Sequence, residues 1–157
     1  MAITADKLRK RKNLTQMSLD IQTVVTAVTV YLGGLVNWVG AGGRVRAAAA
    51  TAGHMFCGEV IAWENTSGSA LAAITGNTGG TVKVLVGYGH QALVTLATSI
   101  RTNSKLGKVV YASDNDIVTG TAAGTAAVRI QVGSLESRVG STEGYVRLRR
   151  LGATTSS

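Results

Sequence analysis

The chain has 157 residues, of which 45% are apolar and only 15% charged, a balance that excludes a disordered protein. Its length suits one domain with a single core, and its 20 glycines and many Thr and Val residues favour strands and turns over helices. The net charge of +8 excludes no anionic partner, because nucleic acid, an anionic membrane and an acidic protein surface would all attract it.

Cys57 is the only cysteine, so the chain cannot form an internal disulfide and its fold does not need an oxidising compartment. The apolar run from Val24 to Val36 is rich in Thr and shorter than the ~20 residues of a membrane span. A polar stretch follows the basic N-terminus where a signal peptide would have its apolar region. We therefore expect a soluble protein that is made inside a cell and has no membrane partner.

The N-terminal segment is strongly basic. Residues 1–13 contain one acidic residue, Asp6, and five basic ones, which are Lys7, Arg9, Lys10, Arg11 and Lys12. Dense like charges repel one another and this segment has little apolar surface to bury, so we interpret residues 1–22 as an extended arm.

The residues that follow allow two interpretations. Apolar residues recur at the spacing of an amphipathic helix, at Leu14, Met17, Ile21, Val24, Val25 and Val28. The run TVVTAVTVY is nevertheless dense in β-branched residues, which lose rotamer freedom in a helix and pack well on a pleated sheet. We therefore predict a strand over about residues 23–31.

Alternating apolar residues bounded by glycine-rich turns predict further short strands along the chain. These cover residues 35–39, a short piece around 44–46, 56–64, 81–88, 90–96, 128–132 and 145–149. Residues 65–80 are rich in Ser, Thr, Gly and Asn and should form a long connection. Residues 152–157 are interpreted as a flexible tail.

Residues 106–118, with the sequence LGKVVYASDNDIV, predict a β-hairpin. Val110 and Ala112 should share one face of its first strand, and the Ser/Asp/Asn cluster of residues 113–116 should turn the chain. Asp114 and Asp116 suggest a calcium loop, but the glycine and the distal glutamate of that motif are missing. Their expected role is therefore geometric.

The remaining candidates for chemistry do not form a convincing site. His54, Cys57 and His90 are unlike the ligands of a structural zinc site, which takes four Cys or His ligands from paired motifs. Apolar neighbours would raise the pKa of Cys57 rather than activate its thiol. Glu59 and Glu64 are five residues apart on a strand and so lie on opposite faces. We expect no catalytic residue, no metal, no cofactor and no enzymatic activity.

The expected fold is therefore all-β, a small β-barrel or sandwich of short strands with an extended N-terminal arm. The arm covers residues 1–22, the barrel domain residues 23–151 and the tail residues 152–157.

Five weak motifs occur in a familiar order. They are TVYLGGLV (29–36), AAATAGHMFCGEVI (48–61), TVKVLVGY (81–88), LGKVVYASDNDIVTG (106–120) and VRIQVGSLES (128–137), followed by the ending YVRLR. In this order they resemble the head-decoration, or capsid cement, proteins of bacteriophages, and the resemblance spans roughly residues 1–150. The absence of proline and the unusually basic KLRKRK segment depart from that pattern.

The resemblance implies a structural virion protein on the outer surface of the phage head, made in the host cytoplasm. Its partner would be the major capsid protein, and it would self-associate, with a trimer expected and a dimer left open. The implied function is to decorate and stabilise the capsid by binding across neighbouring subunits. We expect the arm to make that contact through Lys7, Arg9, Lys10, Arg11, Lys12, Leu14, Met17, Leu19 and Ile21.

A nucleic-acid-binding β-barrel is the alternative function. It would use the basic arm together with a second basic face formed by Arg129, Arg147 and Arg149. Proteins that bind single strands rely on several stacking aromatic residues, and this chain is only 4% aromatic. A solvated edge strand protected by charge explains the same arginines, so nucleic acid ranks second as a partner.

Overall fold

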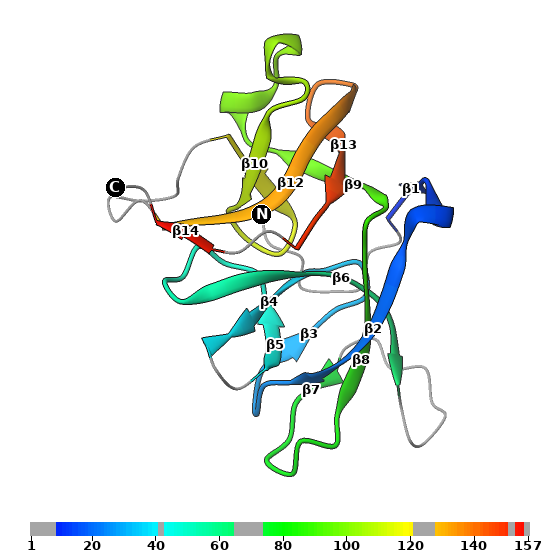
Figure 1. Ribbon diagram of the computed structural model, residues 1–157, viewed down its shortest axis with the longest axis vertical. Coiled ribbons are helices and arrows are strands. Elements are labelled where there is room, and N and C mark those ends of the chain that lie inside the picture. Colours follow the sequence, from blue (N-terminus) through cyan, green and yellow to red (C-terminus); the bar gives the residue numbers. More distant parts are fainter. Residues whose placement is uncertain (1–8, 41–42, 65–73, 121–127, 151–152, 156–157) are drawn as a thin grey trace.

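The computed structural model describes residues 9–40, 43–64, 74–120, 128–150 and 153–155 (Figure 1). The predicted all-β fold is confirmed, since the regular structure of these residues consists of strands and short 3₁₀ turns. The 3₁₀ turns are η1 (Leu14–Gln16), η3 (Thr98–Ile100) and η4 (Asn103–Lys105). The strands are β1 (Arg11–Lys12), β2 (Ser18–Val24), β3 (Thr29–Val30), β4 (Leu35–Val39), β5 (Arg44–Ala47), β6 (His54–Glu64), β7 (Ile74–Thr75), β8 (Lys83–Tyr88), β9 (Gln91–Leu96), β10 (Val109–Ala112), β11 (Ile117–Thr119), β12 (Val128–Val139), β13 (Glu143–Leu148) and β14 (Ala153–Thr155).

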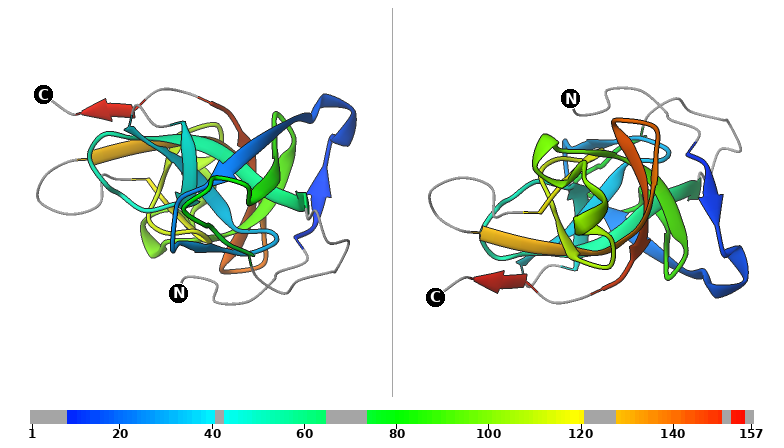
Figure 2. Two further views of the ribbon diagram at one scale, coloured as in Figure 1. Left: turned by 90° about the horizontal axis from the view of Figure 1, so that it is seen from below. Right: turned by 90° about the horizontal axis from the view of Figure 1, so that it is seen from above.

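The first half of the chain closes into a barrel of five strands in the order β2-β5-β4-β6-β8. Strand β8 closes it by pairing antiparallel with both β2 and β6, so none of the five strands is left with a free edge. Its interior holds a cluster of small β-branched side chains that includes Val24, Val45, Val84 and Val86. We call this the N-terminal barrel, and Figure 2 views it from below in its left panel.

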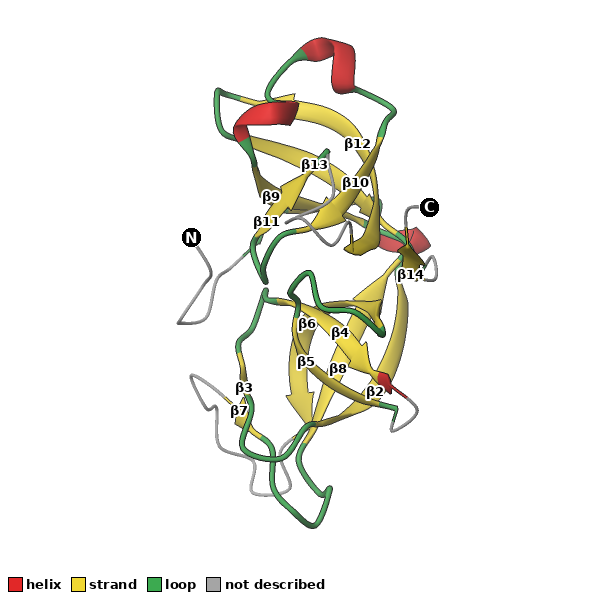
Figure 3. Cartoon of the chain, turned by 90° about the vertical axis from the view of Figure 1, so that its left-hand side faces the viewer, coloured by secondary structure: helices red, strands yellow, loops and turns green. Residues whose placement is uncertain are grey.

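The second half forms another ring of strands. The sheet order is β1-β9-β11-β10-β12-β13, and β13 also pairs with β9, which closes a ring of β9, β11, β10, β12 and β13. Its interior contains Val94, Leu96, Val118, Ile130 and Val146 among others. We call this the C-terminal barrel, and Figure 3 shows the two barrels stacked along the long axis of the molecule.

The two barrels share a wall made by β4 and β6. Val36, Cys57 and Val60 point into the N-terminal barrel, whereas Leu35 and Phe56 from the same two strands belong to the cluster of the C-terminal barrel. The expectation of a single core is therefore wrong, because the buried side chains form two clusters on opposite faces of one wall.

A β-bulge in this wall sets which side chains face the C-terminal barrel. In the ladder between β4 and β6, Val36 pairs with Gly58 but Asn37 pairs with Phe56, so β6 contains an extra residue there. Gly58 is required at the bulge because a Cβ atom would lie 2.4 Å from the carbonyl oxygen of Gly87. The extra residue lets Phe56 and Glu59 both face the C-terminal barrel.

The predicted strand over residues 23–31 is wrong in its extent. Strand β2 ends at Val24 and β3 covers only Thr29–Val30. Between them Val28 donates a backbone hydrogen bond to Val25, and Ala27 takes a left-handed φ of 60° while donating to Gly76. A contact with a distant segment therefore breaks the run, although its residues favour a strand throughout.

The predicted hairpin is confirmed as β10 and β11, and Val110 and Ala112 share its buried face. The Asp114 carboxylate accepts hydrogen bonds from the backbone amides of Asp116 at 2.8 Å and Ile117 at 2.7 Å. That geometry is an Asx turn, so the carboxylate shapes the backbone as expected.

Two predicted irregular segments contain short strands. In the long connection, residues 65–73 lie outside the described residues, but Ile74–Thr75 forms β7 and pairs with β3. In the tail, Ala153–Thr155 forms β14, antiparallel to residues 128–130 of β12. The boundary placed after residue 22 falls inside β2, so residues 18–22 are part of the N-terminal barrel.

Candidate functional site

Arg9, predicted to contact a partner, lies buried between the two barrels with 5% of its surface exposed. Its guanidinium forms an ion pair with Asp116, with 2.8 Å between Nη2 and Oδ1. It also donates hydrogen bonds to the carbonyl oxygens of Leu93 at 2.8 Å, Asn115 at 3.2 Å and Gly33. The start of the described chain is thus anchored to three separate segments.

Arg11 is also used inside the molecule. Its Nε lies 3.1 Å from both carboxylate oxygens of Glu59, and its Nη2 lies 2.8 Å from Oε1. The same carboxylate is 2.7 Å from Nε2 of His90, and Glu59 and His90 are both fully buried. Because a buried charge needs such partners, this network fixes residues 9–12 against the body of the protein.

The other basic residues of the predicted arm point towards solvent or lie outside the described residues. Lys10 and Lys12 are exposed, and the Lys12 ammonium lies 4.1 Å from the ring centroid of Tyr145, a cation–π contact. Tyr145 is only 8% exposed beneath this contact. Lys7 lies outside the described residues. Leu14, on η1, is 58% exposed.

An apolar surface covers the outer face of the N-terminal barrel. Leu19 is 54% exposed and Ile21 is 52% exposed, and across the ladder Ile21 pairs with Leu85 while Leu19 pairs with Gly87. Paired residues of antiparallel strands project from the same face. A Cβ on Gly87 would lie 2.7 Å from Ile61 and 3.2 Å from the Met17 sulfur, so both side chains cover that glycine. We define the outer apolar face as Met17, Leu19, Ile21, Ile61 and Leu85.

Sequence reasoning identified only part of this face. Met17, Leu19 and Ile21 were expected to contact a partner, but Ile61 and Leu85 were not. The alternation in β8 could have identified Leu85, because Val84 and Val86 point inwards and their neighbour must point outwards. Ile61 is the extra residue of a second bulge, between Val60 and Ala62, and its outward direction follows from the inward-pointing Val60 before it.

The second predicted basic face is not a row of free cations. Arg147 donates hydrogen bonds to the Gln16 side chain and to the Gly89 carbonyl oxygen at 3.3 Å, and its Nε lies 3.7 Å from the Glu136 carboxylate. Arg149 is exposed. The backbone of Arg129 lies in β12, and its side chain is outside the described residues.

His54 and Cys57 lie on opposite sides of β6. His54 is buried, and desolvation, together with the nearby Arg46, lowers its pKa below the ordinary 6.5. Burial raises the pKa of the Cys57 thiol to about 12, the direction expected from its apolar surroundings. Among the described residues no three His, Cys, Asp or Glu side chains gather into a group that could hold a metal ion. No described helix is long and apolar enough to cross a membrane.

Comparison with protein-family models and with curated proteins finds no match to this sequence. The fold therefore defines the class of the chain as an all-β protein that contains a closed five-stranded barrel.

Proposed function

We propose that the chain is a structural protein of a phage virion, which decorates the outer surface of the head and stabilises it by binding across neighbouring major capsid protein subunits. The outer apolar face is the observation that carries this proposal. Large apolar side chains that are more than half exposed at alternate positions of one strand, and so on one face, are typical of a surface that a partner covers.

The mechanism is binding linkage. On burial, each of Leu19 and Ile21 would contribute roughly 1 kcal/mol, since about half of each side chain is still exposed to water. Lys10 and Lys12, on the segment that leads into this face, suit an acidic rim on the partner. A ligand that binds the assembled shell and not its disrupted states stabilises the shell by mass action.

Self-association would strengthen this binding. Two or three copies joined in one oligomer convert later contacts with the head into intramolecular events, so weak individual contacts add up. We therefore propose a homo-oligomer, with a trimer expected and a dimer left open.

The nucleic-acid alternative has less support. The Arg147 guanidinium already has partners inside the molecule, and so do Arg9 and Arg11, which leaves fewer cations for phosphate contacts. No described feature favours this alternative over the capsid.

The experiment uses heads purified from the phage that encodes the chain, prepared without this protein. Deleting the arm is not a clean test, because Arg9 and Arg11 hold the fold together. The better variant is L19S/I21S, which changes side chains that point to solvent. Leu106→Ser is the matched control, because Leu106 is 40% exposed and lies on the C-terminal barrel instead.

We expect wild-type protein and the Leu106→Ser variant to co-sediment with the heads and raise their temperature of disruption. The L19S/I21S variant should bind with an affinity reduced by roughly tenfold or more. Full occupancy and full heat protection by L19S/I21S would overturn the proposed surface. DNA binding that weakens steeply with salt, without binding to heads, would favour the alternative function.

A further inference from the structure

Arg150 follows β13 and crosses from the C-terminal barrel to the N-terminal barrel. Its Nε donates a hydrogen bond of 2.8 Å to the carbonyl oxygen of Cys57, on β6. Its Nη1 lies 3.1 Å from the Asp20 carboxylate, on β2. A residue at the end of the last long strand therefore binds two strands of the other barrel.

Two aromatic rings flank the same guanidinium. Its Cζ lies 3.7 Å from the ring centroid of Tyr88 and 4.6 Å from that of Trp38. Both distances are well within the ~6 Å over which a cation is attracted to an aromatic ring. Aromatic faces, a carboxylate and a carbonyl oxygen together match the planar shape and the in-plane donors of a guanidinium better than a compact ammonium.

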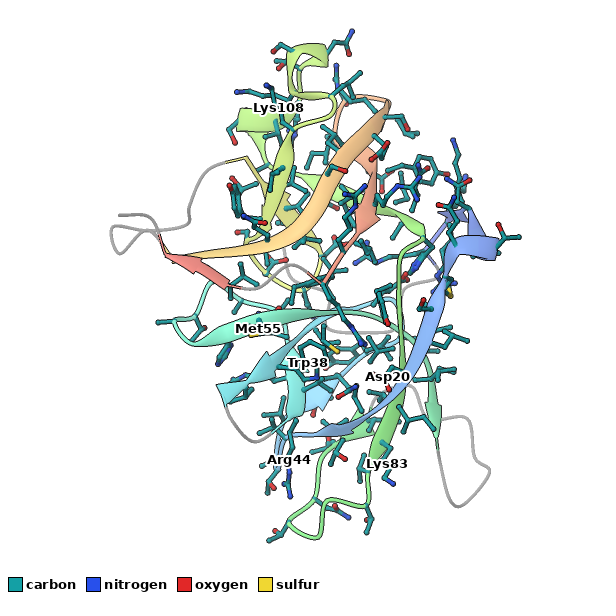
Figure 4. The ribbon with its side chains drawn as sticks, viewed as in Figure 1. Asp20, Trp38, Arg44, Met55, Lys83 and Lys108 are labelled. Carbon is teal, nitrogen blue, oxygen red and sulfur yellow. The ribbon has the colours of Figure 1, made fainter. Side chains whose placement is uncertain are left out.

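The contacts around the guanidinium do not all depend on Arg150. Gln22 donates a hydrogen bond of 2.8 Å to the Asp20 carboxylate and accepts one of 2.8 Å from the Trp38 indole nitrogen. Gln22 therefore holds the carboxylate and one ring in place, so the site would persist without its occupant. Figure 4 labels Asp20 on β2 and Trp38 on β4, two strands of the N-terminal barrel with β5 between them.

We propose that Asp20, Trp38, Tyr88 and the Cys57 carbonyl form a guanidinium-binding site on the N-terminal barrel, and that its ligand is the chain's own Arg150. The site takes alkylguanidinium groups as a chemical class. With Arg150 in place it acts as a latch that ties the C-terminal end of β13 to the N-terminal barrel. This inference is independent of what the outer apolar face binds.

The labelling rate of Cys57, the only cysteine, can measure whether the guanidinium site is filled. Cys57 is fully buried, and Nη2 of Arg150 lies 3.6 Å from its sulfur, so the guanidinium covers the thiol on this side. The rate at which an aromatic disulfide reagent labels Cys57 under native conditions therefore reports whether the site is filled. The midpoint of denaturant unfolding, measured in parallel, separates local opening from global unfolding.

The experiment compares wild type with Arg150→Ala and with Arg149→Ala, an exposed neighbour that serves as the matched control. We expect Arg150→Ala to speed labelling by roughly tenfold or more and Arg149→Ala to leave it unchanged. Millimolar ethylguanidinium, which replaces the missing atoms, should restore slow labelling in Arg150→Ala. Ethylammonium at the same concentration should not.

Three results would overturn the proposal. They are labelling of Arg150→Ala at the wild-type rate, an equal effect of Arg149→Ala, and equal rescue by ethylammonium and ethylguanidinium. If Arg150→Ala does not fold, Arg150→Lys takes its place, because it keeps the charge and the apolar stem. Faster labelling of Arg150→Lys supports a site selective for guanidinium, and labelling at the wild-type rate overturns it.

Discussion

Arg11 and Glu59 are 48 residues apart in the chain and form a two-pronged ion pair in which the carboxylate is fully buried. Glu59 lies on the face of the shared wall that looks towards the C-terminal barrel, and Arg11 lies on the short strand that pairs with β9. The pair therefore joins the N-terminal segment to both barrels.

Glu59→Ala should be strongly destabilising, because it leaves Arg11 and the buried His90 without their shared carboxylate. Losing one partner of a buried pair costs about 3–5 kcal/mol of the free energy of unfolding. Equilibrium denaturant unfolding measures this. Glu136→Ala is the control, since Glu136 is exposed and pairs with Arg147 at 3.7 Å, and it should cost under about 1 kcal/mol. Equal costs for the two variants would contradict the assigned role of Glu59.

Asp114→Ala should destabilise the hairpin, because two backbone amides in the turn lose their acceptor. The expected loss is about 1–2 kcal/mol of the free energy of unfolding. Asp114→Asn keeps an oxygen at the same position and should recover most of that loss. A calcium-dependent shift in the melting temperature of wild type would instead contradict a purely geometric role.

Gly133→Ala should be among the most damaging single changes. A Cβ there would lie 1.7 Å from the carbonyl oxygen of Arg147, and backbone of a paired strand cannot move aside cheaply. We expect a loss of about 3 kcal/mol or more, measured by thermal or denaturant unfolding. Gly79→Ala is the control, because its nearest neighbour is a methyl group at 3.8 Å. A neutral Gly133→Ala would show that β12 and β13 are further apart than described.

His54 should make the protein less stable in mild acid. Desolvation and Arg46 lower the pKa of its folded form below 6.5, so the unfolded chain binds more protons as the pH falls past 6.5. The free energy of unfolding is therefore unaffected by this group above pH 6.5, where His54 is neutral in both states, and it falls progressively below that pH. The free energy of unfolding of wild type, compared with His54→Asn from pH 7 to pH 5, should show a steeper fall for wild type. Parallel curves would contradict this.

The alternation of apolar residues was enough to predict most strands. It predicted β4 at residues 35–39, the strand over residues 81–88 that contains β8, and the hairpin with its Asx turn. These features depend on local spacing and on turn chemistry, which a sequence displays directly.

Alternation could not show which barrel a side chain enters. Leu35 and Val36 are neighbours that belong to different cores, and only the packing of one barrel on the other makes both faces of β4 apolar. The burial of Arg9 and Arg11 was missed for a related reason. Their partners Asp116 and Glu59 are distant in sequence, so the basic run had the pattern of a solvated arm.

The shared wall has a consequence for how the chain could be divided. A cut after Tyr88 would separate the strands of the two rings cleanly along the sequence, yet the first fragment would then present Leu35 and Phe56 to water. The second fragment would lose Leu35 and Phe56, the apolar side chains that pack against its own buried cluster. The halves are therefore interdependent, and they should melt in one cooperative transition instead of two.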